Sequence, residues 1–206
     1  MEELTVADEP PKQDESAHVE DEETPNGGND RRNTVIEWVL TLGIAFLVGW
    51  TFHMFVARSY VIPSESMVPT LEVGDLLIGE SVTSESHDPD IGDIVTFYSP
   101  KGDGTTLIKR VIAKGGSTID LRDGDVYVDG EKLDEPYVHG QDTEPLYEYS
   151  DISYPYTVPE DSVFVMGDNR GNSADSRVFG AVPESELTSH IIWRFWPIDE
   201  IGNPEE

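Results

Sequence analysis

The chain of 206 residues contains no cysteine. Disulfide bonds, thiolate catalysis and cysteine-based zinc sites are therefore excluded. Its five histidines are scattered and show no H-E-x-x-H or other paired-ligand spacing, and the carboxylates are not grouped as in an EF-hand loop. We therefore expect no metal ion and no other cofactor.

Basic residues are scarce: 13 Lys and Arg stand against 42 Asp and Glu, for a net charge of −29. Residues 1–33 hold 11 acids and 3 bases, and residues 34–206 hold 31 acids and 10 bases. A folded domain this acidic repels phosphates, which argues against nucleic-acid binding. The charge fits either an ordinary acidic surface or adaptation to high salt, where the Debye length shrinks to about 3 Å at 1 M. We favour the second hypothesis, which predicts unfolding of the domain as NaCl is lowered towards ~0.1 M.

Residues 1–33 have almost no large apolar side chains and are interrupted by Pro and Gly. Such a segment cannot bury enough surface to offset the entropy of ordering. We predict a disordered acidic tail and assign it no function.

A long apolar run follows the tail. Residues 38–57 contain no Asp, Glu, Lys or Arg, and as a helix they would extend about 30 Å, the thickness of the hydrocarbon core. We predict a transmembrane anchor over residues 34–57. A cleavable signal peptide is the alternative, but the run is long for one and the preceding tail is long and acidic. Arg31 and Arg32 against Arg58 favour a cytoplasmic N-terminus and an external C-terminal domain.

The remaining chain, residues 58–206, has short β-branched and aromatic runs separated by Gly and Asp turns. Asp129-Gly130 is a hairpin-turn signal. We predict a mostly β, antiparallel domain, with residues 134–159 as an excursion that has little core pattern. The predicted strand runs are 76–78, 94–98, 107–113, 126–128, 162–166 and 190–196.

One of the five lysines lies in a strand-like apolar run. Lys109 follows Leu107 and Ile108, precedes Val111, and by strand alternation shares a face with Leu107 and Val111, whereas Arg110 points to the other side. A lysine on a strand is more often a snorkelling surface residue. A desolvated lysine, however, can lose its proton and serve as a general base for a serine hydroxyl.

A candidate nucleophile lies upstream, in Pro63-Ser64-Glu65-Ser66-Met67-Val68-Pro69-Thr70-Leu71. Two prolines stiffen this segment and limit its local hydrogen bonding, which suits a serine held open for attack. A turn rich in Ser and Thr is the alternative interpretation. Downstream, residues 167–177 read Gly-Asp-Asn-Arg-Gly-Asn-Ser-Ala-Asp-Ser-Arg, of which the Gly-Asp-Asn part alone would fit an ordinary Asx-turn.

The serine segment, the lysine run and the 167–177 loop, in this order behind an apolar stretch, together resemble the type I signal peptidases. The resemblance extends from about Glu37 to about Pro197, and a lysine in place of histidine is typical of the bacterial and organellar form. It implies that Ser66 is the nucleophile and Lys109 its base, with the oxyanion bound by the Ser64 hydroxyl and the Ser66 backbone N–H. It also implies that Ser173 hydrogen-bonds the lysine amine, that Asp175 and Arg177 form a structural ion pair, and that Asp168 and Asn169 form the turn. Glu65 stands where relatives often have Gly, so we expect its side chain to point outward.

The implied function is removal of signal peptides from exported preproteins at A-x-A-like sites, at the external face of the plasma membrane. Its partners would be preproteins, the lipid bilayer and the secretion translocon. Phe195 and Trp196 would either contact lipid or pack in the core.

Two alternative functions stay open. A LexA-like self-cleaving protease uses the same pair of residues, but needs a DNA-binding domain and an Ala-Gly cleavage site, which this chain lacks. A membrane-anchored module that binds signal peptides without catalysis would be favoured by loss of Ser66 or Lys109, and both are present.

Overall fold

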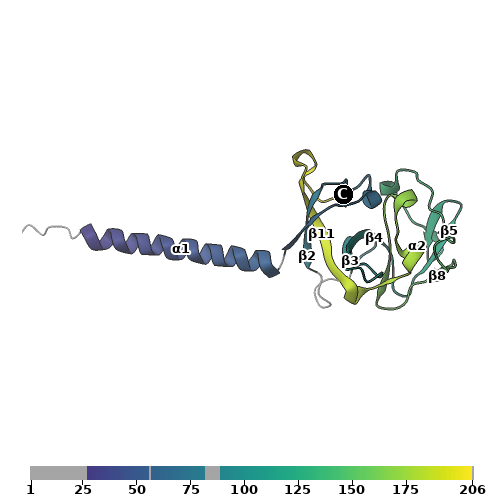
Figure 1. Ribbon diagram of the computed structural model, residues 1–206, viewed down its shortest axis with the longest axis horizontal. Coiled ribbons are helices and arrows are strands. Elements are labelled where there is room, and N and C mark those ends of the chain that lie inside the picture. Colours follow the sequence, from purple (N-terminus) through teal and green to yellow (C-terminus); the bar gives the residue numbers. More distant parts are fainter. Residues whose placement is uncertain (1–26, 56, 82–88, 206) are drawn as a thin grey trace, which may run out of the picture. The chain divides into compact units, whose positions relative to one another are not determined.

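The computed structural model describes residues 27–55, 57–81 and 89–205 (Figure 1). The chain divides into two units, Met1–Phe46 and Leu47–Glu206. Most of the predicted disordered tail, residues 1–26, lies outside the described residues.

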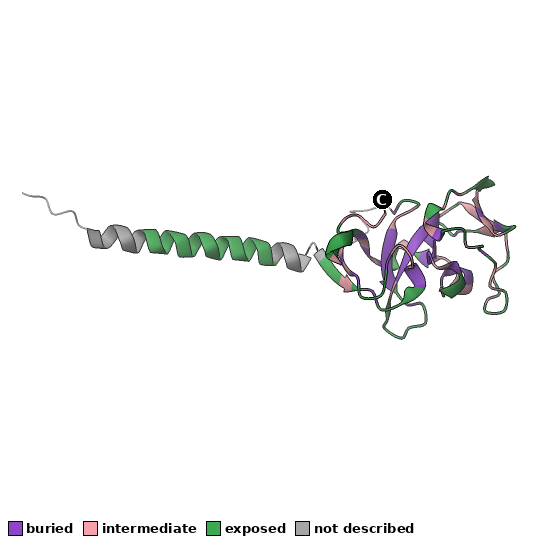
Figure 2. Ribbon diagram, turned by 90° about the horizontal axis from the view of Figure 1, so that it is seen from above, coloured by how far each residue is buried: buried purple, intermediate pink, exposed green. Residues whose placement is uncertain are grey.

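The long helix α1 covers Gly27–Phe55. It begins within the predicted tail and includes most of the segment predicted as an anchor, and its residues 34–50 are exposed (Figure 2). Among the described residues, no helix combines the length and the hydropathy needed to cross a membrane.

The rest of the described chain is built from short strands. They are β1 (Ala57–Val61), β2 (Leu76–Ser81), β3 (Ile94–Tyr98), β4 (Thr106–Lys114), β5 (Thr118–Arg122), β6 (Asp125–Val128), β7 (Glu131–Lys132), β8 (Tyr156–Thr157), β9 (Ser162–Met166), β10 (Val182–Pro183) and β11 (Leu187–Trp196). The helical turns between them are η1 (Glu65–Met67), η2 (Pro136–Val138), η3 (Arg170–Asn172), α2 (Ser176–Phe179), η4 (Glu184–Glu186) and η5 (Ile198–Glu200).

The strands form two antiparallel sheets. The larger has the order β1-β2-β11-β3-β4-β9-β10 and the smaller the order β7-β6-β5-β8. Figure 1 shows β11, the last strand of the chain, between β2 and β3. The prediction of a mostly β, antiparallel domain is confirmed, and each of the six predicted runs forms a strand.

The predicted hairpin turn is also confirmed. Val128 pairs with Glu131 across it, and Asp129 and Gly130 have φ of 51° and 87°. Two consecutive residues with positive φ match the twist of a two-residue hairpin, and Asp-Gly adopts this conformation at little cost.

Three apolar clusters form the core (Figure 2). One contains Met67, Leu71, Ile94 and Ile108, so it lies directly beside the serine segment. A second contains Val111 with Leu107 packed against it, the two residues predicted to share a face with Lys109. The third, around Ile112, Phe164 and Met166, joins strands of both sheets. Because β4 supplies residues to all three clusters, its lysine lies at the centre of the domain's packing.

The excursion at 134–159 is attached to the smaller sheet. It includes η2 and β8, and β8 pairs with β5 through Ile119 and Tyr156. Its side chains also reach the 167–177 loop, as described below.

Candidate active site

Ser66 is held in the short turn η1 between β1 and β2. Its neighbour Met67 is fully buried, and the Leu71 N–H donates to the Met67 carbonyl at 2.9 Å. Burial of Met67 and Leu71 fixes the turn, whereas Ser66 itself keeps 8% of its surface exposed. Ser64 precedes the turn in an extended conformation, with φ of −144°, and is exposed.

Lys109 reaches Ser66 from the middle of β4. Its Nζ donates to Ser66 Oγ at 2.7 Å and to the Ile108 carbonyl at 2.8 Å, and the residue is only 3% exposed. Burial lowers the pKa of Lys109 to about 8, although the charges of Asp175 and Asp168 oppose the shift. With this pKa about one tenth of the amine is neutral at pH 7, and a neutral amine has a lone pair that can accept the Ser66 proton.

The 167–177 loop donates hydrogen bonds to the backbone carbonyls of the serine turn. The Asn169 N–H donates to the Ser66 carbonyl at 3.1 Å, and Asn169 Nδ2 donates to the Glu65 carbonyl at 3.0 Å. The Glu65 side chain is exposed, as expected, and its Oε2 accepts from Asn172 Nδ2 at 3.4 Å. The loop therefore fixes the backbone of Glu65 and Ser66, and with it the position of the Ser66 hydroxyl.

Gly167 allows this close approach. A Cβ built at this position would lie 2.7 Å from Ser173 Cβ, and still closer to Ser173 Oγ and the Ser66 carbonyl oxygen. Only a residue without a side chain fits between them, because carbon atoms rarely approach within 3 Å. The glycine is therefore required by packing.

Asp175 and Arg177 form the ion pair that the family resemblance implied. Arg177 Nε donates to Asp175 Oδ1 and its Nη2 to Asp175 Oδ2, both at 2.9 Å. Asp175 also caps α2 by accepting from the Arg177 N–H at 3.2 Å, and accepts from the Gly167 N–H at 3.0 Å. The pair braces both ends of the loop, since Asp175 contacts its first residue and its last.

Asp168 has a second role that the sequence analysis missed. It belongs to the turn, where its carbonyl accepts from the Arg170 N–H at 3.1 Å, but its buried carboxylate binds Arg110. Arg110 donates from Nε and Nη2 at 2.9 and 2.7 Å, and its guanidinium lies 4.1 Å from the centroid of the Tyr137 ring. The signal was available: an arginine on the buried side of a core strand needs a carboxylate partner.

Arg170 is the other functional residue missed. It is 2% exposed and donates to the Gly167 carbonyl at 3.0 Å, while its guanidinium binds Glu135 and the Thr143 hydroxyl. Glu135 and Thr143 both belong to the excursion. The excursion thus supports the loop beneath the serine, which its weak core pattern did not indicate.

The hydrogen bond expected between Ser173 and Lys109 is not made in the described part of the chain. Ser173 Oγ is buried without a hydrogen-bond partner, and the lysine amine donates to Ser66 and Ile108 instead. Ser64 contributes no side-chain bond to cap its turn. Its role in an oxyanion hole therefore stays a prediction.

A serine hydroxyl bonded to a buried amine whose pKa is lowered is typical of a serine hydrolase that uses lysine as its base. A family model and curated relatives identify which kind. A family model described as signal peptidase, peptidase S26, matches residues 35–196. A probable signal peptidase I-1 from Synechocystis sp. is 40% identical over 168 residues, 78% of this chain and 82% of that protein.

Signal peptidase IB from Staphylococcus aureus is 30% identical over 188 residues, covering 84% of this chain and 97% of that protein. Among solved structures, a signal peptidase I from Enterococcus faecalis is 33% identical with a TM-score of 0.44, covering 50% of this chain and 97% of the other. This chain therefore belongs to the signal peptidase family, peptidase S26.

Proposed function

We propose that this chain removes signal peptides from exported preproteins with Ser66 as nucleophile and Lys109 as general base. The observation that carries the proposal is the 2.7 Å contact between Lys109 Nζ and Ser66 Oγ, combined with a lysine pKa lowered to about 8. Neutral Lys109 takes the hydroxyl proton as Ser66 Oγ attacks the scissile carbonyl. The protonated amine then donates to the leaving amine, and in a second step the neutral lysine activates the water that hydrolyses the acyl-enzyme.

The oxyanion of the tetrahedral intermediate needs donors near Ser66. Ser64 and the Ser66 N–H are the proposed donors, and removal of one such donor typically costs about 3–4 kcal/mol of transition-state stabilisation. The exposed position of Ser64 leaves its hydroxyl free to turn towards a bound substrate. Ser173 is the proposed positioning residue for the lysine amine, because its buried hydroxyl makes no hydrogen bond among the described residues and so has none to give up.

The substrate would bind as an extended strand. β1 is an outer strand of the larger sheet, and it leads within five residues to Ser66. An extended peptide added at such an edge presents alternate side chains to the same face, so small residues one and three positions before the cut can enter shallow pockets. This arrangement would account for a preference for A-x-A-like sites.

The membrane is the proposed location. The uncharged residues 38–57 support an anchor over residues 34–57, and the arginine distribution supports a cytoplasmic N-terminus with the peptidase domain outside. Phe195 and Trp196 are 37% and 49% exposed, so each presents apolar surface that packing leaves uncovered, and lipid contact is the proposed role. The translocon is a further proposed partner, because preproteins emerge there.

The test is cleavage of a preprotein with an Ala-x-Ala site, in detergent and high salt. We expect Ser66→Ala and Lys109→Ala to lower kcat/KM by at least about 1,000-fold. Lys101→Ala, at an exposed lysine, is the matched control and should cleave like wild type. Equal cleavage by all variants would refute the proposed pair. A folded wild type that binds signal peptides without cutting them would favour the non-catalytic module.

A further inference from the structure

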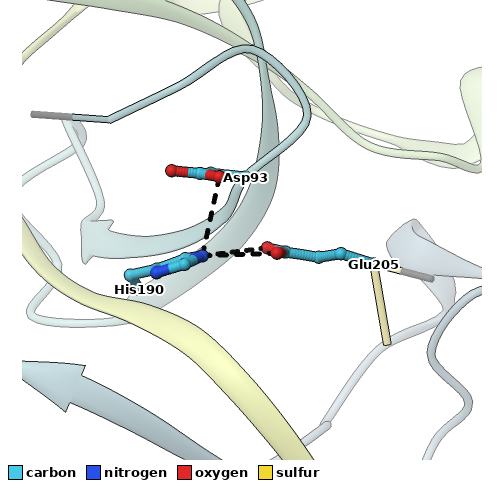
Figure 3. A group of neighbouring side chains, drawn as sticks. All are labelled: Asp93, His190 and Glu205. Atoms are coloured by element: carbon cyan, nitrogen blue, oxygen red, sulfur yellow. Dashed lines mark hydrogen bonds and ion pairs between the residues drawn. The ribbon is translucent and has the colours of Figure 1, made fainter. Parts of the chain in front are cut away.

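A second group of ionisable side chains lies apart from Ser66 and Lys109. Asp93 immediately precedes β3, His190 belongs to β11, and Glu205 lies near the end of the chain. Figure 3 shows the three side chains converging, with dashed lines that join the imidazole of His190 to the carboxylates of Asp93 and Glu205. None of them takes part in the proposed hydrolysis.

The spacing of their ligand atoms fits one metal ion. His190 Nε2 lies 3.4 Å from Glu205 Oε2, 3.1 Å from Glu205 Oε1 and 3.7 Å from Asp93 Oδ1. One ligand atom from each residue lies within 4.8 Å of the others. Zinc bonds of about 2.0–2.1 Å at tetrahedral angles separate ligand atoms by about 3.4 Å, so only small side-chain movements are needed.

Glu205 is oriented by the backbone. The Ile94 N–H donates to Glu205 Oε1 at 2.6 Å, which leaves Oε2 available beside the imidazole. A hydrogen bond to the outer oxygen of a ligating carboxylate is the usual way in which proteins fix such a ligand. The three side chains are 15%, 15% and 17% exposed, so the group is shielded from bulk water but reachable by an ion.

The charge of the group favours a cation. Two carboxylates surround a single imidazole, and Glu80 of β2 pairs with His190 across the sheet. With a protonated imidazole the three side chains sum to −1, and the guanidinium of Arg110, which interacts with Glu205, is already paired with Asp168 by two hydrogen bonds. A divalent ion would neutralise both ligating carboxylates at once.

We propose that Asp93, His190 and Glu205 form a three-ligand Zn²⁺ site that ties the C-terminal segment to β3 and β11. An imidazole nitrogen among the ligands selects zinc and similar transition ions over Ca²⁺ and Mg²⁺, which prefer all-oxygen sites. The sequence analysis expected no metal because the ligands are far apart in the chain, with Glu205 15 residues after His190 and Asp93 on a different strand. Only the folded sheet brings them together.

Titration of the full-length, EDTA-treated protein with ZnCl₂ in a calorimeter tests the proposal. High salt in the buffer suppresses diffuse attraction of cations to the acidic surface. We expect one tightly bound Zn²⁺ per chain. His190→Ala should weaken binding by more than about 100-fold, since even residues outside the ligand set are worth about 10- to 100-fold. Zn²⁺ should also raise the unfolding temperature of wild type and not of this variant.

Two further variants keep the experiment decisive. His139→Asn is the matched control, because His139 is exposed at φ of 51°, a conformation that Asn tolerates, and it should bind Zn²⁺ like wild type. Glu205→Gln keeps the size of the side chain and an oxygen that can accept from the Ile94 N–H, so it tests the site even where His190→Ala does not fold. Absence of saturable Zn²⁺ binding overturns the proposal. So does binding that both ligand variants retain, or that Ca²⁺ and Mg²⁺ displace at equal concentration.

Discussion

Replacement of Gly167 by alanine tests whether the 167–177 loop positions the nucleophile by direct packing. Gly167 lies against the Ser66 carbonyl and the side chain of Ser173. An added methyl group cannot be accommodated by movement of a flexible side-chain end alone, because one of its neighbours is backbone. The serine turn and the loop must therefore move apart.

The size of this movement follows from the contacts. The new Cβ would lie 2.7 Å from Ser173 Cβ, whereas carbon atoms pack at about 3.5 Å, so the separation must grow by about 0.8 Å. The carbonyl of Ser66 is closer still, and its displacement carries the hydroxyl away from Lys109. Misplacement of a reacting group by about 1 Å costs about 100-fold in rate, or about 2.7 kcal/mol. Overpacking should also destabilise the fold by about 1–3 kcal/mol.

Steady-state cleavage of a preprotein gives kcat/KM, and thermal unfolding gives stability. Gly171→Ala is the matched control in the same loop, since a Cβ at that position meets nothing within 4 Å. We expect Gly171→Ala to change kcat/KM by less than about 3-fold. A Gly167→Ala variant as active as this control would refute the idea that packing at Gly167 sets the position of Ser66.

The pKa of Lys109 makes a prediction about pH: kcat/KM should rise about tenfold per pH unit up to about 8 and then level off, and a flat profile would contradict the role of its amine. The same shift makes the buried lysine destabilising at pH values below about 8, where the folded protein carries it charged, and this cost declines as pH rises from the folded pKa of about 8 to the unfolded value of 10.5. Lys109→Met should therefore abolish cleavage but raise the free energy of unfolding at pH 7 by about 1–3 kcal/mol. Denaturation at high pH should show a smaller difference from wild type. A variant less stable than wild type at pH 7 would show that the buried charge is well compensated. Arg110→Met leaves the Asp168 carboxylate buried and unpaired, so denaturation should show a loss of about 3–5 kcal/mol, much of which Arg110→Met/Asp168→Leu recovers. Additive losses in that double variant would rule out the coupling.

Much of the fold was predictable because the local signals agree with the tertiary structure. The runs that became β3 and β9 combine β-branched and aromatic residues, and the run that became β4 is rich in β-branched residues, so propensity and burial favour the same conformation. Of the strands without a prediction, β1 and β5 have five residues each and were missed, whereas β7, β8 and β10 have two residues each, too few for a periodic signal. Their pairing depends on neighbours distant in sequence.

The candidate site was likewise predictable from the sequence only in part. Ser66, Lys109, Asp175 and Arg177 were recognisable because their segments keep a fixed order and spacing along the chain. The partner of Asp168 was not, because Arg110 lies 58 residues away and the pairing exists only when β4 and the loop meet. The support that the excursion gives to Arg170 was missed as well, because it comes from the polar side chains of Glu135 and Thr143, which leave no periodic pattern in the sequence.

The sequence by itself determined the residue types that can perform the chemistry, the class of fold and the family to which the chain belongs. These properties depend on local composition, on alternation along strands and on short contiguous motifs. Each of these signals lies within a short stretch of consecutive residues. Only the tertiary structure decided that the amine of Lys109 lies 2.7 Å from Ser66, that its burial lowers its pKa, and that Asp93, His190 and Glu205 converge. Desolvation and the meeting of charged groups arise from the packing of distant segments, and no local pattern encodes them.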